Sequence, residues 1–370
     1  MQLTLHVTDN CNLNCKYCFV SRNPARMSKE VAFAAAKLGM EDKKKSGLLF
    51  YGGEPLLEKN LIHDVVAYTQ DIAQKTGHMF YYKMTTNGTL LDEDFLKFSK
   101  DIGMALGFSY DGDAQDDCRL FHSGEGSQAL LEEKIPLLLK YHPYAVGMSV
   151  IDPSTVHKAS ATVQSLFEKG FKYITINPNY SRSAPWTRER LAVLEAEYQK
   201  MAEMYIRWTT AESKFYLSPF DVKILSHLKG EKYHADRRAM GKNQPAVATD
   251  GKIYSSSKFI GNPAFEIGDV FSGIDTKKQD AIFEKGAIPL LQCKGCALLS
   301  RCNYAYDSLD YVGQAYAPDI SPVQCAHEQM IAPIADRVAQ KLYADKNPLF
   351  IHKHYNALYP MMSLVEDTGR

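Results

Sequence analysis

The chain has 370 residues, of which 45% are hydrophobic, and its 43 Lys and Arg residues balance its 43 Asp and Glu residues. This length suits one large domain or two ordinary ones with a substantial core. A formal net charge of zero argues against a general nucleic-acid binder and a polybasic membrane binder. The sequence has neither a signal peptide nor an apolar run long enough to span a bilayer, so we expect a cytoplasmic protein without nucleic-acid or membrane partners.

Strand-like and helix-like patterns alternate along roughly the first 210 residues. Apolar or alternating runs predict strands, and runs with helical spacing predict the helices between them. The expected strands are residues 3–8, 47–53, 79–88, 104–112, 144–151 and 173–180. The expected helices are residues 28–45, 60–77, 92–103, 128–142, 161–170 and 188–213.

This alternation predicts an α/β fold with a parallel sheet and crossover helices. A complete eight-fold barrel typically needs about 250 residues, so we expect a partial (β/α)6 TIM-type barrel over residues 1–210. Sites in such sheets lie at the carboxyl ends of the strands. Four unusual stretches, "CNLNCKYC", "GGEP", "TTNG" and "SYDG", each follow a predicted strand, so we expect one set of loops to carry them all.

The character of the chain changes after about residue 240. Residues 246–261 favour a small hairpin with an Asp-Gly turn, and residues 331–345 favour a helix. We therefore divide the chain into a barrel (1–210), a bridging helical region (211–244), a small cysteine-bearing domain (245–330) and a C-terminal helix and tail (331–370).

Three cysteines, Cys11, Cys15 and Cys18, follow the spacing C-x3-C-x2-C. In a reducing cytosol, clustered cysteines indicate metal binding or catalysis more often than disulfides. Three thiolates on one loop can hold three irons of a [4Fe-4S] cube and leave the fourth iron open for chemistry. A zinc site or chance clustering is the alternative that spacing alone leaves open.

This spacing resembles the signature of the radical S-adenosylmethionine (SAM) enzymes. The resemblance extends, strand by strand, over the N-terminal half of the chain. The matching residues are Cys11, Cys15, Tyr17 and Cys18, then 51–55 ("YGGEP"), 85–88 ("TTNG"), 109–112 ("SYDG"), Asp116 and Arg119.

The resemblance implies a [4Fe-4S] cluster held by the three cysteines, with SAM chelating the open iron. It also implies a set of SAM contacts: glycine backbone for the amino group, Arg119 or Ser109 for carboxylate or ribose, Asn87 for ribose, and Tyr17 for adenine. The cofactor-binding residues expected on this basis are Tyr17, Gly52, Gly53, Glu54, Asn87, Ser109 and Arg119.

A second cysteine group, C-x2-C-x5-C followed by one more cysteine, comprises Cys293, Cys296, Cys302 and Cys325. It resembles the SPASM extension of peptide-modifying radical SAM enzymes, whose full pattern holds two auxiliary clusters. Ser256 and Tyr306 stand where cysteines of the proximal cluster are expected. The resemblance therefore implies that this cluster is lost and that the four cysteines hold one auxiliary [4Fe-4S] cluster, with zinc as the alternative.

The catalytic residues are not evident from the sequence. Cys118 is the cysteine left over, and Tyr306 replaces a ligand, so these two are candidates. With the proximal cluster absent, we expect a substrate to fill its place, in a cavity lined by Ser255, Ser256, Ser257 and Tyr306. Ser257 also stands where the sulfatase-maturing pattern has an Asp base, which argues against that activity.

The resemblance implies a maturase that uses a 5′-deoxyadenosyl radical to abstract hydrogen from a ribosomally synthesised peptide and install a thioether or carbon–carbon cross-link. The alternatives are a small-molecule substrate, a sulfatase-maturase type of protein modification, and a non-enzymatic iron–sulfur electron carrier. Expected partners are a peptide with a leader and a reductant such as flavodoxin or ferredoxin. Because the barrel pattern begins at residue 1, we expect leader binding to use the barrel, the extension or a separate leader-recognition protein.

Overall fold

The computed structural model describes residues 1–40, 44–229, 244–286, 291–302, 321–359 and 362. Among these residues, no helix has both the length and the apolar character needed to cross a membrane.

Strands and helices alternate through the described residues from 2 to 229. The strands are β1 (Gln2–Thr8), β2 (Leu13–Cys15), β3 (Lys45–Gly52), β4 (Met79–Thr86), β5 (Ala105–Ser109), β6 (Arg119–Phe121), β7 (Val146–Ile151), β8 (Tyr173–Pro178) and β9 (Tyr216–Ser218). The helices are α1 (Lys29–Leu38), α2 (Lys59–Thr76), α3 (Glu93–Asp101), α4 (Gln115–Cys118), α5 (Gln128–Tyr141), α6 (Ala159–Glu168), α7 (Arg188–Thr210) and α8 (Phe220–Lys229).

Among the described residues after 243, the chain adds short strands and further α-helices. They are β10 (Ala246–Val247), β11 (Lys252–Tyr254), β12 (Glu266–Asp269), β13 (Gly273–Ile274), α10 (Thr276–Gly286), α11 (Pro322–Ala344) and α12 (Pro348–Tyr355).

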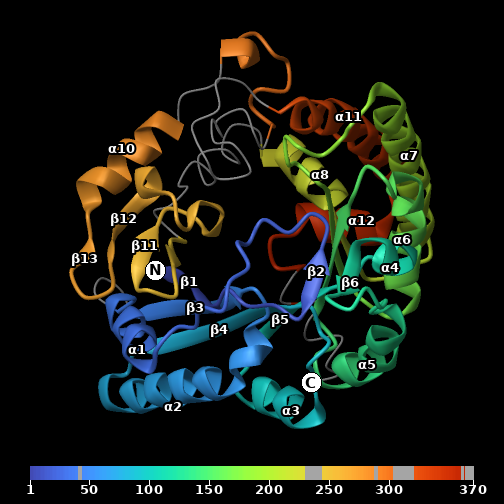
Figure 1. Cartoon of the computed structure of the whole chain (residues 1–370). Coiled ribbons are helices and arrows are strands. Elements are labelled where there is room, and N and C mark those ends of the chain that lie inside the picture. The colour runs from blue at the N-terminus through green and yellow to red at the C-terminus, as the bar shows by residue number, and fades with distance from the viewer. Residues whose placement is uncertain (41–43, 230–243, 287–290, 303–320, 360–361, 363–370) are drawn as a thin grey trace.

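The described strands other than β2 and β6 form one 11-stranded sheet in the order β13-β12-β11-β10-β1-β3-β4-β5-β7-β8-β9. The six strands predicted for the barrel, β1, β3, β4, β5, β7 and β8, pair in parallel. The structure thus confirms the parallel sheet of a partial TIM-type barrel. Figure 1 shows the helices along the outside of the curved sheet and the loop with β2 on its inside.

Strand β1 shows why the sheet is buried on both faces. Leu3, Leu5 and Val7 point to the helix side, where the Leu3 side chain lies close to Gly39 at the end of α1. The alternate residues Thr4, His6 and Thr8 point the other way and are also buried. A parallel strand covered on both faces usually consists of a near-continuous apolar run, so the buried polar side chains of β1 distinguish its inner face from its helix-covered face.

Helix ends follow local chemistry. The Ser28 side chain caps α1 by accepting from the Val31 N–H at 3.2 Å, and Asp92 caps α3 in the same way. The prediction of a helix as far as residue 45 is wrong, because α1 ends at Leu38 and Lys45 already begins β3. Gly77 ends α2 with a φ of 72°, in the left-handed region where glycine is favoured.

The cysteine-bearing extension continues the barrel sheet. Strand β10 pairs in parallel with β1, with Thr4 opposite Ala246 and Leu5 opposite Val247, and β11 turns back on β10 through Gly251. The predicted hairpin is therefore present, and it joins the first strand of the barrel. On the far edge, β9 adds a strand parallel to β8 that the sequence analysis did not predict.

Candidate active site

The loop after β1 carries the three N-terminal cysteines and lies against the carboxyl ends of neighbouring strands. Within it, β2 pairs with β6 in antiparallel fashion, which places Cys15 opposite Arg119. The Lys16 N–H donates to the Cys118 carbonyl at 3.0 Å and continues this pairing. The motif that follows β5 is thereby fixed to the cysteine loop.

Gly52 and Gly53 let the end of β3 approach the same loop. A Cβ on Gly52, whose φ is +125°, would lie 2.1 Å from the Thr8 carbonyl oxygen, and one on Gly53 would lie 2.0 Å from that of Asn10. The Gly53 N–H donates to the Thr8 carbonyl oxygen at 2.8 Å. Close backbone approach explains both glycines, and a contact from either glycine to SAM stays a prediction.

Glu54 is fully buried and joins two of the predicted motifs. Its Oε1 accepts from the Thr86 hydroxyl at 2.7 Å and from the Leu56 N–H at 2.9 Å, and its Oε2 accepts from the Asn87 N–H at 2.7 Å. Burial raises the pKa of Glu54 to about 7, although these hydrogen bonds oppose the rise. Glu54 therefore holds the ends of β3 and β4 together.

Asn87 lies next to the first cysteine. Its Nδ2 donates to Asn12 Oδ1 at 2.8 Å and lies 3.7 Å from the Cys11 sulfur, while its Oδ1 accepts from the Thr89 hydroxyl at 2.7 Å. Hydrogen bonds to cluster sulfurs are one of the ways in which a protein adjusts a cluster's potential. Asn87 thus lies within reach of the sulfur of a predicted cluster ligand, and its predicted ribose contact stays a prediction.

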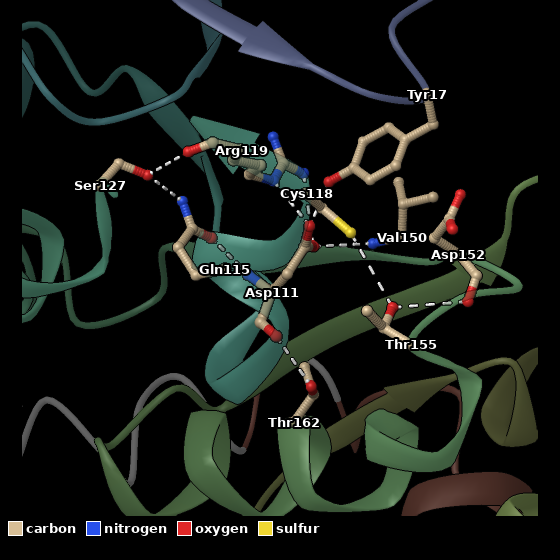
Figure 2. A network of polar contacts seen from close by, with 10 residues as sticks. All are labelled: Tyr17, Asp111, Gln115, Cys118, Arg119, Ser127, Val150, Asp152, Thr155 and Thr162. Atoms are coloured by element: carbon tan, nitrogen blue, oxygen red, sulfur yellow. Dashed lines mark hydrogen bonds and ion pairs between the residues drawn. The ribbon is translucent and has the colours of Figure 1, made fainter. Parts of the chain in front are cut away.

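Asp111 is the centre of a buried network that the sequence analysis left without a role (Figure 2). Its Oδ2 accepts from Arg119 Nε at 2.9 Å and from the Tyr17 hydroxyl, and its Oδ1 accepts from the Val150 N–H at 3.0 Å. Gln115 Oε1 accepts from the Asp111 N–H at 2.9 Å, and the Thr162 hydroxyl donates to the Asp111 carbonyl at 2.8 Å. Only the position of Asp111 after a strand could have drawn attention to it.

Arg119 and Tyr17 are tied to that carboxylate. Burial alone would lower the pKa of Arg119, but Asp111 raises it well above its ordinary value, so the guanidinium stays charged. It also lies 5.2 Å from the centre of the Tyr17 ring. Both side chains therefore lie at the cysteine loop, as predicted, but each has a protein partner there. The ring contact with adenine and the contact with the SAM carboxylate stay predictions, as does that of Ser109 at the end of β5.

The thiols of the loop influence one another. The pKa of Cys11 is raised to about 11, mainly by burial, with Glu54, Cys15 and Cys18 adding to the rise and the Leu13 N–H opposing it. Burial also raises the pKa of Cys15, against the opposing effect of Arg119. Three thiols that would repel one another as thiolates suit a cationic iron cluster, which binds the deprotonated form.

The second cysteine group lies on short turns and at the start of α11. Cys293 and Cys302 are buried, Cys296 is exposed and Cys325 is partly buried. Burial raises the pKa of Cys293, and Cys325 and Cys296 add to the rise, so these three lie close enough to interact. The Cys296 N–H donates to the Cys293 carbonyl at 3.1 Å.

Ion pairs between helices support this second group. Lys223 of α8 is fully buried and lies 2.6 Å from a Glu328 oxygen of α11, and its Nζ also donates to the Arg301 carbonyl at 3.3 Å. Arg301, next to Cys302, contacts both carboxylate oxygens of Asp336 at 2.7 and 2.6 Å.

Within the described residues, no group of three or more His, Cys, Asp or Glu side chains is arranged to hold a metal ion. Cysteines that ligate different irons of a cube do not have to converge on one point, so the donor set of the first loop still fits a cluster. The same donor type fits a cluster at the second group.

Cys118, the leftover cysteine, is fully buried. Its sulfur lies 3.9 Å from the Thr155 hydroxyl, beside the Asp111 network (Figure 2). Burial raises its pKa to about 11, which keeps the thiol protonated and a weak nucleophile. A catalytic role for Cys118 stays a prediction, and its surroundings favour a structural one. Tyr306 lies outside the described residues.

A cavity of about 530 Å³ lies between the cysteine loop and the turn after β11, and we call it the His6 cavity. Its walls include His6 and Asp9 on the β1 side, Cys18 and Phe19 on the loop, and Ser257 and Lys258 on the turn. Of the three serines predicted to line a substrate cavity, the structure therefore places Ser257 there.

The other two serines are placed differently. Ser255 is buried and its hydroxyl has no hydrogen-bond partner among the described residues. Ser256 uses its hydroxyl to accept from the Lys258 N–H at 3.4 Å.

Another cavity, of about 730 Å³, lies at the amino ends of β8 and β9. Its walls include Tyr173, Tyr216 and the buried pair of Lys353 and Asp221, whose Nζ and Oδ1 are 2.7 Å apart. Chemistry in parallel barrels occurs at the carboxyl ends of the strands. We therefore place the candidate active site at the cysteine loop and the His6 cavity.

Residues 5–166 match the family model described as the Radical SAM superfamily. An uncharacterised protein of Methanocaldococcus jannaschii is 30% identical over 183 residues, which cover 47% of this chain and 61% of that protein. A cysteine-type anaerobic sulfatase-maturating enzyme of Clostridium novyi is 25% identical over 187 residues, covering 46% of this chain and 49% of that enzyme. The chain thus spans about half to three fifths of these two relatives.

Solved structures share the fold over more of the chain. Native anSMEcpe with bound AdoMet and Cp18Cys peptide has a TM-score of 0.78 at 18% identity, and covers 93% of this chain and 99% of its own. SuiB of Streptococcus suis bound to its precursor peptide SuiA has a TM-score of 0.61 at 13% identity, and covers 88% and 75%.

Proposed function

Because residues 5–166 match the Radical SAM superfamily model, we propose that this chain is a radical SAM enzyme that modifies a peptide. One observation carries the proposal: three interacting thiols lie on a single loop, and buried hydrogen bonds fix that loop to the ends of the neighbouring strands. Cys11, Cys15 and Cys18 would hold the [4Fe-4S] cluster. Bound SAM would supply a carbon radical that removes a hydrogen atom from the substrate.

The chain's own residues would bind and orient these groups. Asp111 holds Arg119 and Tyr17 in place, and Glu54 holds the strand end that carries Asn87, so the cysteine loop is preorganised before SAM arrives. The seven SAM contacts expected from the sequence remain proposals. Among them, Glu54 is better suited to organising the loops, since both of its oxygens accept hydrogen bonds from the chain.

A peptide substrate is supported by two features. The His6 cavity opens beside the cysteine loop at the strand ends where the radical would form. Two proteins with the same fold were solved with peptides bound. We propose a ribosomally synthesised peptide with a leader as the substrate, a flavodoxin or ferredoxin as the reductant, a separate protein as one route to leader recognition, and a thioether or carbon–carbon cross-link as the product.

Sulfatase maturation is the second candidate. The likeness to the Clostridium novyi enzyme favours it, whereas Ser257, which stands where that activity would place an Asp base, opposes it. A peptide with a sulfatase-type cysteine distinguishes the two: conversion of that cysteine without a cross-link supports maturation.

The test of the proposal is SAM cleavage by protein reconstituted without oxygen and reduced with dithionite. We expect 5′-deoxyadenosine and methionine in equal amounts. Reconstituted protein that binds iron but forms no 5′-deoxyadenosine would instead favour the electron-carrier alternative. The enzyme is then incubated with peptides encoded beside the gene and, separately, with small-molecule candidates. The kind of molecule that is converted to product identifies the substrate class.

A further inference from the structure

His6 differs from the other buried histidines among the described residues. Its side chain is 2% exposed, and neither ring nitrogen has a hydrogen-bond partner among those residues. Other buried histidines are paired: His78 with the Ser46 hydroxyl at 2.8 Å and His327 with the Tyr198 hydroxyl at 2.7 Å. A buried polar group without a partner destabilises a fold, so the ones that occur call for an explanation.

The surroundings of His6 orient the ring. Its Nδ1 lies 3.9 Å from Asp9 Oδ1, which is too far for a hydrogen bond but close enough to favour a proton on that nitrogen. Asp9 is itself held, because Asn23 Nδ2 donates to its Oδ2 at 3.1 Å. Burial lowers the pKa of His6, although Asp9 opposes the effect, so the ring is neutral near pH 7. A neutral ring with its proton on Nδ1 has Nε2 as an acceptor.

The position of His6 indicates which kind of molecule would donate a hydrogen bond to Nε2. His6 lines the cavity that Cys18 and Phe19 of the cysteine loop and Ser257 of the turn after β11 also line. A cavity of about 530 Å³ falls within the range of ligand sites, which typically combine a few polar groups with shape. A peptide chain carries a backbone N–H donor at every residue except proline.

We propose that the His6 cavity binds a segment of the substrate peptide and that His6 Nε2 accepts a hydrogen bond from a backbone N–H of that segment. Asp9, held by Asn23, is the positioning residue that keeps Nε2 available as the acceptor. This inference rests on the proposed peptide substrate. It assigns to β1 a substrate contact beside the cysteine loop, opposite the turn that carries Ser257.

Two peptide probes of equal length separate this contact from general binding. The first is acetyl-(Ala-Ser)3-amide, which carries backbone N–H groups, and the second is an acetylated hexamer of N-methylglycine with a dimethylamide end, which has none. Binding of each probe is measured by calorimetry with the full chain carrying its clusters, and without SAM. We expect the first probe to bind about three- to tenfold more tightly, as the net value of one hydrogen bond implies.

Variants then locate the acceptor. In His6→Leu the difference in affinity between the two probes should decrease to the part that other contacts contribute. In His6→Gln, whose Oε1 is an acceptor, most of the difference in affinity should remain. His142→Gln is the control, since that half-buried histidine pairs with the Ser99 hydroxyl at 2.8 Å outside the cavity. An undiminished difference in His6→Leu, or no measurable binding of the first probe to the parent, would overturn the inference.

A measurement on the parent protein covers the case in which His6→Leu does not fold. With histidine ring nitrogens labelled by ¹⁵N, the first probe should shift the His6 Nε2 resonance and leave those of His142 unchanged. Equal shifts, or none up to the solubility limit, would refute the contact. Because neither probe binding nor the ¹⁵N shift involves SAM cleavage, failure here is distinct from failure of the proposed function.

Discussion

The two cysteine groups lie on different kinds of scaffold. The first group is on a loop at the carboxyl edge of the sheet, where backbone pairing with β6 and contacts to Gly53 and Asn87 hold it. The second group lies on turns and the start of α11, supported by side-chain ion pairs of α11 with α8 and with the turn that carries Arg301. Both have a buried ion pair behind them, Asp111 with Arg119 and Lys223 with Glu328.

This difference indicates how far the chain itself orders each cysteine group before a cofactor binds. Backbone hydrogen bonds at a sheet edge fix a loop from several sides at once, and they do not depend on the cluster. A cluster that joins the turns of the second group to α11 would contribute to the order of those turns, because metal binding and folding are coupled. The predictions below test this contrast, from the largest expected effect to the smallest.

Cys15→Ala should abolish 5′-deoxyadenosine formation. A cube held by three cysteines has no spare protein ligand, so loss of one should remove the cluster, while the loop stays paired with β6 through its backbone. Anaerobic assay and circular dichroism check the two parts. Cys118→Ala, at the buried thiol beside the network, is the matched variant for iron content and should keep the parent's iron. Unchanged SAM cleavage in Cys15→Ala would contradict the assignment.

Cys293→Ala should lower the iron content from about eight to about four atoms per chain, as expected for two cubes of which one is lost. SAM cleavage without peptide should persist, because the first loop lies on a separate scaffold. Metal analysis together with the 5′-deoxyadenosine assay measures both. If the parent protein contains about four irons and one zinc, the second cysteine group is a zinc site and not an auxiliary cluster.

Asp111→Asn should destabilise the fold by about 3–5 kcal/mol, because it leaves the buried Arg119 charge without its carboxylate. Glu328→Gln breaks the buried pair behind the second group and should cost a comparable amount. Asp71→Asn, in an exposed pair with Lys75, should cost at most about 0.5 kcal/mol. Urea unfolding followed by circular dichroism compares the free energies of unfolding of the three variants. If Asp111→Asn costs no more than Asp71→Asn, the Asp111 network does not stabilise the fold.

Acid should weaken the C-terminal helices through His354 of α12. Burial lowers the pKa of His354 to about 4, although the nearby Asp221 carboxylate opposes this shift. In the unfolded chain the pKa of a histidine has its ordinary value near 6.5. Between these values the unfolded state binds more protons, so stability is fully present above pH 6.5 and is lost as pH falls toward 4. We expect a loss of about 2 kcal/mol from this group between pH 7 and pH 5.

His354→Gln should remove that pH dependence, while His352→Gln, at an exposed position of the same helix, should keep it. Unfolding by urea at several pH values measures both. A pH profile that is the same in parent and His354→Gln would show that other groups cause the acid sensitivity.

Much of the fold follows from the sequence alone. The alternating apolar residues in β1 and the helical spacing with a Ser28 cap are local patterns. Such patterns can be recognised from the sequence because they depend only on residues near one another in the chain. The four motifs after the strands also located the candidate site, because parallel strands bring their carboxyl ends to one edge.

Other features depended on contacts between residues far apart in the chain. Three such features are the pairing of β10 with β1, the burial of Asp111 against Arg119 and Tyr17, and the unpartnered ring of His6. Each of them depends on segments that share no sequence pattern. An Asp before a glycine and a His within a strand look the same whether they face solvent or a cavity. The sequence by itself therefore indicated most strands and helices of the barrel and the two cysteine groups, and only the tertiary structure decided which polar groups are buried and which are paired.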